Sequence, residues 1–128
     1  MCNLDKFTKE ELEEALRAIT STINKSEKVQ LKLKAGTFQH TMTVRGIKAY
    51  NIAIELIKRE WETAEDSFEG RYTKEEFEEA LQALTSAISR VEKVLPKFNA
   101  GTSQHTLAIR RIKAFCIATE LIKRELDS

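Results

Sequence analysis

The residues best suited to chemistry in this chain occur in one short string that appears twice. It reads Gly-Thr-Phe-Gln-His-Thr at 36–41 and Gly-Thr-Ser-Gln-His-Thr at 101–106, and it contains both histidines of the chain. Hydroxyl, amide and imidazole groups of this kind can bind an anion, hold a metal ion or transfer a proton. The residues around each string indicate which of these roles the sequence supports.

Metal binding and catalysis both lack the partners that they require. Zinc needs three or four ligands, and no Asp, Glu or Cys lies close in sequence to either histidine. A histidine that acts as a general base needs a nucleophile and an orienting carboxylate, and neither accompanies the strings. Phosphate-loop, dinucleotide-binding, zinc-ribbon and Glu-x-x-His patterns are absent from the sequence. We therefore expect no enzymatic activity, no metal and no cofactor.

Anion binding has more support, because basic residues gather around both strings. Residues 24–48 and 89–113 contain twelve Lys or Arg and two Glu, a formal charge of +10 in a chain whose net charge is +1. A concentrated positive charge attracts anions, and helix N-termini bind them through free amides. Alternatively, the charge is solvated surface that complements the helix dipoles, while Thr, Gln and His bond locally to the backbone. The candidate anion-binding residues are Thr37, Gln39, His40, Arg45, Lys48, Thr102, Gln104, His105, Arg110, Arg111 and Lys113.

The elements that must position these residues follow from an internal repeat. Shifting the sequence by 65 residues superposes 7–63 on 72–128 without a gap, and about 34 of the 57 paired positions are identical. A solenoid needs more repeats than two, since each unit requires neighbours to cover its apolar face. The two units are therefore expected to cover each other.

Each copy carries the start and stop signals of a helical hairpin. The string Thr-Lys-Glu-Glu at 8–11 and at 73–76 predicts a capping box, and apolar residues at spacings of three and four follow it. Gly36 and Gly101 predict left-handed turns, and the threonine after each predicts a cap for the next helix. Pro96 should bend or loosen the end of its helix, because it removes a backbone donor.

These signals predict an all-α chain that forms one up-down-up-down four-helix bundle over residues 1–128. The first hairpin is expected at about 7–65, a linker at about 66–71 and the second hairpin at about 72–128. Short connections make consecutive helices antiparallel, so both Ala-Gly-Thr turns should lie at the same end of the bundle.

The second helix of each hairpin has an apolar face wider than its position requires. Its arc spans about 220°, whereas a surface helix needs about 100° or somewhat more. The extra residues could pack against two neighbouring helices, or they could form an exposed stripe that mediates homodimerisation. The candidate interface residues are Ala49, Ile52, Leu56, Ala114, Ile117 and Leu121.

Two cysteines do not make a disulfide framework, and no apolar run approaches the length of a signal peptide core or a membrane span. We therefore expect a cytoplasmic protein that does not enter the membrane. The leading functional hypothesis is a non-enzymatic helical interaction module that binds a protein partner or itself, as a homodimer. The alternative hypothesis is binding of an anionic ligand or a nucleic acid at the basic end.

Overall fold

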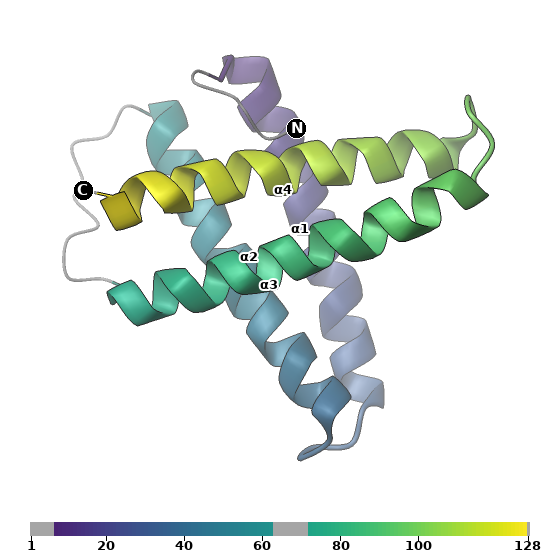
Figure 1. Ribbon diagram of the computed structural model, residues 1–128, viewed down its shortest axis with the longest axis horizontal. Coiled ribbons are helices and arrows are strands. Elements are labelled where there is room, and N and C mark those ends of the chain that lie inside the picture. Colours follow the sequence, from purple (N-terminus) through teal and green to yellow (C-terminus); the bar gives the residue numbers. More distant parts are fainter. Residues whose placement is uncertain (1–6, 63–71, 128) are drawn as a thin grey trace.

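The computed structural model describes residues 7–62 and 72–127, so the predicted linker at 66–71 lies outside the described residues. Within those ranges the chain forms four long helices and no strand, which confirms the predicted all-α four-helix bundle (Figure 1). The helices are α1 (Lys9–Lys32), α2 (Phe38–Glu62), α3 (Lys74–Val94) and α4 (Ser103–Asp127), and a short 3₁₀ helix, η1 (Leu95–Lys97), follows α3.

The helix ends lie where the local sequence signals predict them. Thr8 and Thr73 each form a capping box with the glutamate three residues later. Gly36 and Gly101 both adopt a φ of +91°, a conformation that favours glycine, and each ends its connection in a left-handed turn. Pro96 lies in η1. As a result, regular α geometry ends three residues earlier in α3 than at the corresponding position of α1.

The two hairpins cross at a steep angle instead of lying side by side (Figure 1). α2 contacts α1, α3 and α4, and α4 contacts α1, α2 and α3, whereas α1 and α3 do not touch within the described ranges. The turn between α1 and α2 and the turn between α3 and α4 consequently lie far apart. The prediction that both turns share one end of the bundle is therefore wrong.

The hairpins cross at the midpoints of α2 and α4. There, Tyr50 and Phe115 stack with their ring centroids 5.5 Å apart and their planes 7° apart. Small residues on both helices let the backbones approach closely beside this stack, and they are at most 1% exposed. These small residues are Ala49, Ala53, Ala114 and Ala118. The largest fully buried side chains of the described residues belong to the same core: Ile19, Ile52, Ile57, Leu84, Phe115, Ile117 and Ile122.

This packing explains the wide apolar face of the second helix in each hairpin. The six candidate interface residues are between 0% and 5% exposed, so all of them belong to the core of the chain itself. They are Ala49, Ile52, Leu56, Ala114, Ile117 and Leu121. The exposed-stripe interpretation is thus overturned: each of these helices contacts three others, and a homodimer has no free surface at these positions.

The contacts between the hairpins come in pairs whose members are 65 residues apart. Lys48 pairs with Glu76 at 2.9 Å, and Lys113 pairs with Glu11 at 3.1 Å. In the same way, Arg59 pairs with Glu125, and Arg124 pairs with Glu60. The hairpins are therefore related by an approximate twofold axis that passes through the Tyr50–Phe115 stack.

We predict that shortening the side chain of Ile52 or Ile117 destabilises the bundle. If these residues formed an exposed homodimer interface, the folded chain would tolerate the same substitutions. Ile52→Ala and Ile117→Ala should each lower the free energy of unfolding by about 2–5 kcal/mol, because each leaves a cavity in a packed core. Urea denaturation followed by circular dichroism measures the change. Leu31→Ala, at a side chain that is 88% exposed, is the matched control and should have little effect. A wild-type stability for either isoleucine variant would contradict the packing described.

The approximate twofold axis predicts that one hairpin can replace the other. Residues 1–65 alone contain a copy of both members of each ion pair, as Lys48 with Glu11 and Arg59 with Glu60. Expressed by itself, this segment should form a helical homodimer, because its apolar face needs a second hairpin to cover it. Light scattering should give twice the monomer mass. A folded, fully helical monomer would refute the idea.

Candidate functional site

Each Ala-Gly-Thr turn is closed by its threonine, which bonds to the connection before it and to the first turn of the helix after it. The Thr37 hydroxyl donates to the Lys34 carbonyl at 2.7 Å and accepts from the His40 amide at 3.2 Å. Thr102 repeats the arrangement with Asn99 at 2.8 Å and His105 at 3.2 Å. For the two threonines, the local interpretation is thus confirmed: both hydroxyls are engaged in holding the turn.

The histidine strings do not meet in one site. His40 and His105 are half-buried on separate turns, and Gln39 and Gln104 are exposed beside them. Because the hairpins cross, the two turns lie at different ends of the molecule (Figure 1). Among the described residues, no group of three or more His, Cys, Asp or Glu side chains could hold a metal ion.

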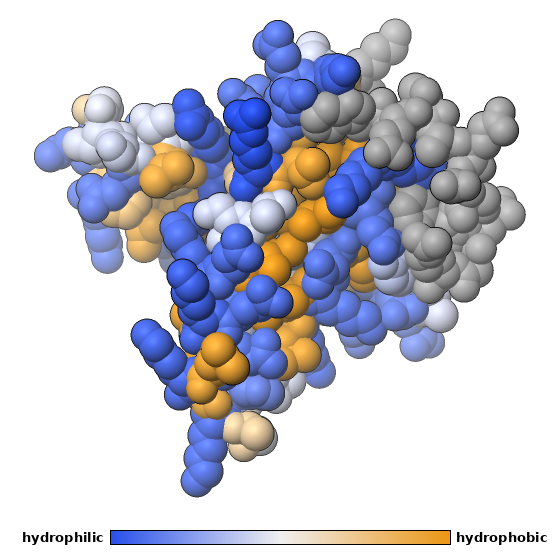
Figure 2. Space-filling model, turned by 180° about the vertical axis from the view of Figure 1, so that it is seen from behind, coloured by the Kyte–Doolittle hydropathy of each residue, from blue (hydrophilic) through white to orange (hydrophobic). Residues whose placement is uncertain are grey.

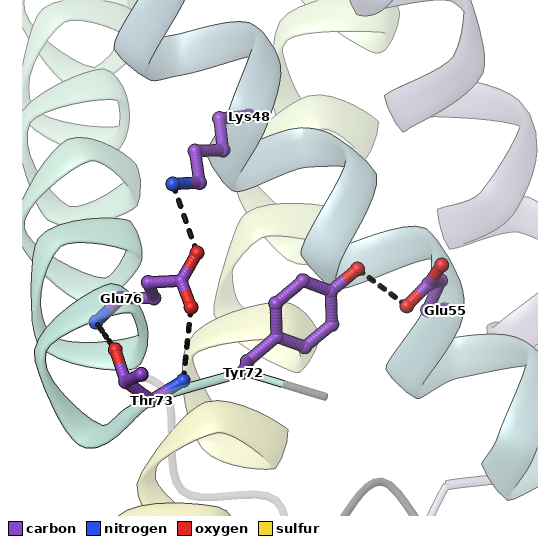
Figure 3. A network of polar contacts seen from close by, with 5 residues as sticks. All are labelled: Lys48, Glu55, Tyr72, Thr73 and Glu76. Carbon is purple, nitrogen blue, oxygen red and sulfur yellow. Dashed lines mark hydrogen bonds and ion pairs between the residues drawn. The ribbon is translucent and has the colours of Figure 1, made fainter. Parts of the chain in front are cut away.

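Two of the candidate cations hold the hairpins together. Lys48 and Lys113 lie near the middle of their helices, and each pairs with a capping-box glutamate of the other hairpin, as Figure 3 shows for Lys48 and Glu76. The helix dipole acts mainly within the end turns, so the ion pairs account for the lysines at these positions. They also remove both lysines from the predicted anion site.

These contacts, together with the capping boxes, lower the pKa values of Glu11 and Glu76. Hydrogen bonding from the Thr8 amide, followed by the Lys113 ammonium, holds the pKa of Glu11 below its ordinary value. The Thr73 amide and Lys48 lower the pKa of Glu76 in the same way, and Glu76 in turn raises the pKa of Lys48. Beside this pair, the Tyr72 hydroxyl donates to a Glu55 carboxylate oxygen and fixes the start of α3 to α2 (Figure 3).

We predict that acid weakens the bundle partly through these two glutamates. A folded pKa below the unfolded value of about 4.3 stabilises the fold at higher pH, and this contribution is lost as the pH falls through the folded pKa values. The double variant Glu11→Gln with Glu76→Gln keeps an acceptor for the cap but loses the charge.

The difference in unfolding free energy between the wild type and this variant should therefore be largest near neutral pH and should vanish in strong acid. Urea titrations at a series of pH values measure it. Glu10→Gln with Glu75→Gln, in the same helix turns but outside the capping boxes, is the matched control. A difference independent of pH would contradict the assignment.

A cleft opens where the first hairpin leaves the second. Its volume is about 540 Å³, and residues of α1 and α2 form most of its lining. Two arginines reach it from the second hairpin, Arg90 from α3 and Arg111 from α4, and Lys25 reaches it from α1. Tyr50 lies at its base; burial raises the pKa of this phenol, while Arg90 and Arg111 act in the opposite direction.

Two smaller pockets flank the crossing and are related to each other by 65 residues. One, of about 280 Å³, places Arg110 with Glu14 in its lining, and the other, of about 250 Å³, places Arg45 with Glu79. Of the predicted anion-binding arginines, Arg111 lines both the large cleft and the pocket that contains Glu14, whereas Arg45 and Arg110 line only the smaller pockets. Sequence reasoning missed the cleft because the crossing creates it.

The ends of the hairpins beyond the crossing, residues 24–46 and 89–111, are here called the hairpin tips. Together they contain ten Lys or Arg and two Glu, a formal charge of +8. Seven large apolar residues of the described chain are between 38% and 88% exposed, and all seven lie on the tips. They are Val29, Leu31, Phe38, Val44, Val94, Leu107 and Ile109. From behind, Figure 2 shows an apolar strip that runs along the first hairpin between hydrophilic residues.

The cysteine chemistry differs from what the sequence indicates. Cys116 is buried in α4 and disulfide-bonded, and its partner lies outside the described residues. The cysteines therefore no longer support the expectation of a cytoplasmic protein, because disulfides persist mainly in oxidising compartments.

None of the helices in the described part of the chain is long and apolar enough to cross a bilayer. No protein-family model matches the chain, and no curated protein and no solved structure with significant similarity to it was found.

Proposed function

We propose that this chain is a non-enzymatic helical interaction module that binds an acidic protein partner through its hairpin tips. One observation carries the proposal: the most exposed large apolar residues and the excess positive charge occur on the same two segments. Exposed apolar groups surrounded by charge are typical of surfaces that another molecule covers.

The rest of the molecule supports this division of roles. Acidic residues of the first turns, Glu11 and Glu76, are engaged in joining one hairpin to the other. The tips take little part in the core, which is concentrated around the crossing of α2 and α4. A partner with acidic groups around an apolar patch would be steered by the charge of the tips and held by apolar burial.

Binding of a nucleic acid is the alternative, and the geometry favours it less. Stacking on bases requires exposed aromatic side chains, and on the described tips only Phe38 is both aromatic and largely exposed, at 76%. The two turns also lie apart, so their helix N-termini do not form one phosphate site. A nucleic-acid complex would weaken steeply with added salt, whereas a complex held by apolar contacts would weaken much less.

Site-specific photocrosslinking in the source cells tests the proposal. A photoreactive phenylalanine analogue replaces Phe38 on the first tip or Leu107 on the second, and both positions are exposed. The matched controls carry the analogue at Glu10 or Glu75, exposed positions in the acidic first turns of α1 and α3. We expect the tip positions to give a distinct adduct with an acidic protein, which mass spectrometry identifies, and the controls to lack it.

Purified protein then separates the apolar contribution from the charge. Val94→Ser with Leu107→Ser should weaken binding of that partner by about tenfold or more at every salt concentration, with unchanged helicity, since both side chains are exposed. Adducts with RNA or DNA at the tips, or equal adducts at tips and controls, would overturn the proposal.

A further inference from the structure

We infer that the large cleft binds a small organic anion with a carboxylate at one end and an apolar chain. This inference goes beyond the proposed function and does not depend on it. The cleft, of about 540 Å³, lies within the range of roughly 300–1,000 Å³ that is usual for small-molecule sites.

The apolar part of the ligand would lie between α1 and α2. The side chains that line this part of the cleft are Val29, Leu33, Phe38, Met42 and Tyr50. Tyr50 is only 6% exposed and is backed by its stack on Phe115, so the base of the cleft is rigid. Val29 and Phe38, by contrast, are 48% and 76% exposed, and a bound chain would cover apolar surface that is now open to water.

A glycine keeps this space open in the first hairpin alone. A Cβ atom built at Gly46 would meet only the Tyr50 ring, at 3.8–3.9 Å, so the surrounding space is free. The residue 65 positions later is Arg111, and its side chain lines the cleft of the first hairpin from across the crossing. The glycine therefore leaves room in the cleft, and the arginine contributes a cation to it.

The charge of the cleft favours a carboxylate head. Its lining includes Lys25, Arg90 and Arg111, and no Asp or Glu is among the described residues that form it. Arg90 and Arg111 enter the lining from α3 and α4, and both act on the Tyr50 phenol in the direction that lowers its pKa. Guanidinium groups bind planar carboxylates through paired hydrogen bonds. A polyphosphate would leave the apolar lining unused.

Calorimetric titration of the full chain with three ten-carbon probes tests the inference. The probes are decanoate, decanol and decyltrimethylammonium, all below the concentrations at which they aggregate. We expect decanoate to bind one molecule per chain and at least about tenfold more tightly than either of the others. Inorganic phosphate, which has the charge but no chain, should bind weakly.

Matched variants locate the site. Arg90→Gln with Arg111→Gln should weaken decanoate binding by about tenfold or more, to the level of decanol, whereas Arg45→Gln with Arg110→Gln should not, because Arg45 and Arg110 do not line the cleft. Gly46→Leu should weaken both decanoate and decanol by filling the cleft, and its helicity should be retained because a Cβ atom at this position meets only ordinary van der Waals contacts.

Equal binding of decanoate and decanol to the wild type would overturn the inference. So would equal losses in the two double-arginine variants, or phosphate binding as tight as that of decanoate. Circular dichroism of every variant shows that it is folded, and the arginine comparison remains decisive if Gly46→Leu is not.

Discussion

The close approach of α2 and α4 at their midpoints determines the rest of this structure. Four alanines leave room for the two backbones, and the stacked rings of Tyr50 and Phe115 fill the space at the centre. Longer side chains at Ala53 or Ala118, which are fully buried, would separate the helices and force a different angle. The steep angle in turn brings the N-terminus of each hairpin beside the middle of the other. That placement creates the ion pairs of Lys48 and Lys113.

The same crossing divides the molecule into two chemically different regions. At the crossing, carboxylates and cations of opposite hairpins are paired, and the apolar face of each helix is covered. Beyond it, each hairpin continues with too few neighbours to cover its side chains, and positive charge and apolar groups remain at the surface. Both proposals depend on this division. The tips offer a large surface to a partner, and the cleft between them and the crossing offers a smaller, more enclosed one.

Features encoded by neighbouring residues could be predicted from the sequence, and features that depend on packing between hairpins could not. The capping boxes of Thr8 and Thr73, the left-handed glycines and the effect of Pro96 are local, so the helix boundaries agree with the structure. The wide apolar face is visible in the sequence. Periodicity alone, however, does not show whether another helix of the same chain or a second chain covers that face.

The site was harder to predict, because distance along the chain does not show which charges meet. In the sequence, Lys48 resembles an unpaired cation, because its partner, Glu76, is distant along the chain. Two signals were nevertheless present. The paired alanines four residues apart on each crossing helix are compatible with a close approach, and the exchange of Gly46 for Arg111 is one of the differences between the copies that lie in the cleft.

The position of the crossing also gives the molecule the mechanics of a pair of levers. Each turn lies about 13 residues from the stacked rings, or about 20 Å along its helix. A rotation of about 10° between the hairpins at this pivot would therefore carry each turn by about 3.5 Å, while the side chains at the crossing itself would move far less. Small adjustments in the packing of the alanines are thus amplified at the ends, where the exposed apolar and basic side chains lie. A change in the crossing angle would therefore appear mainly as a change in the spacing between the tips.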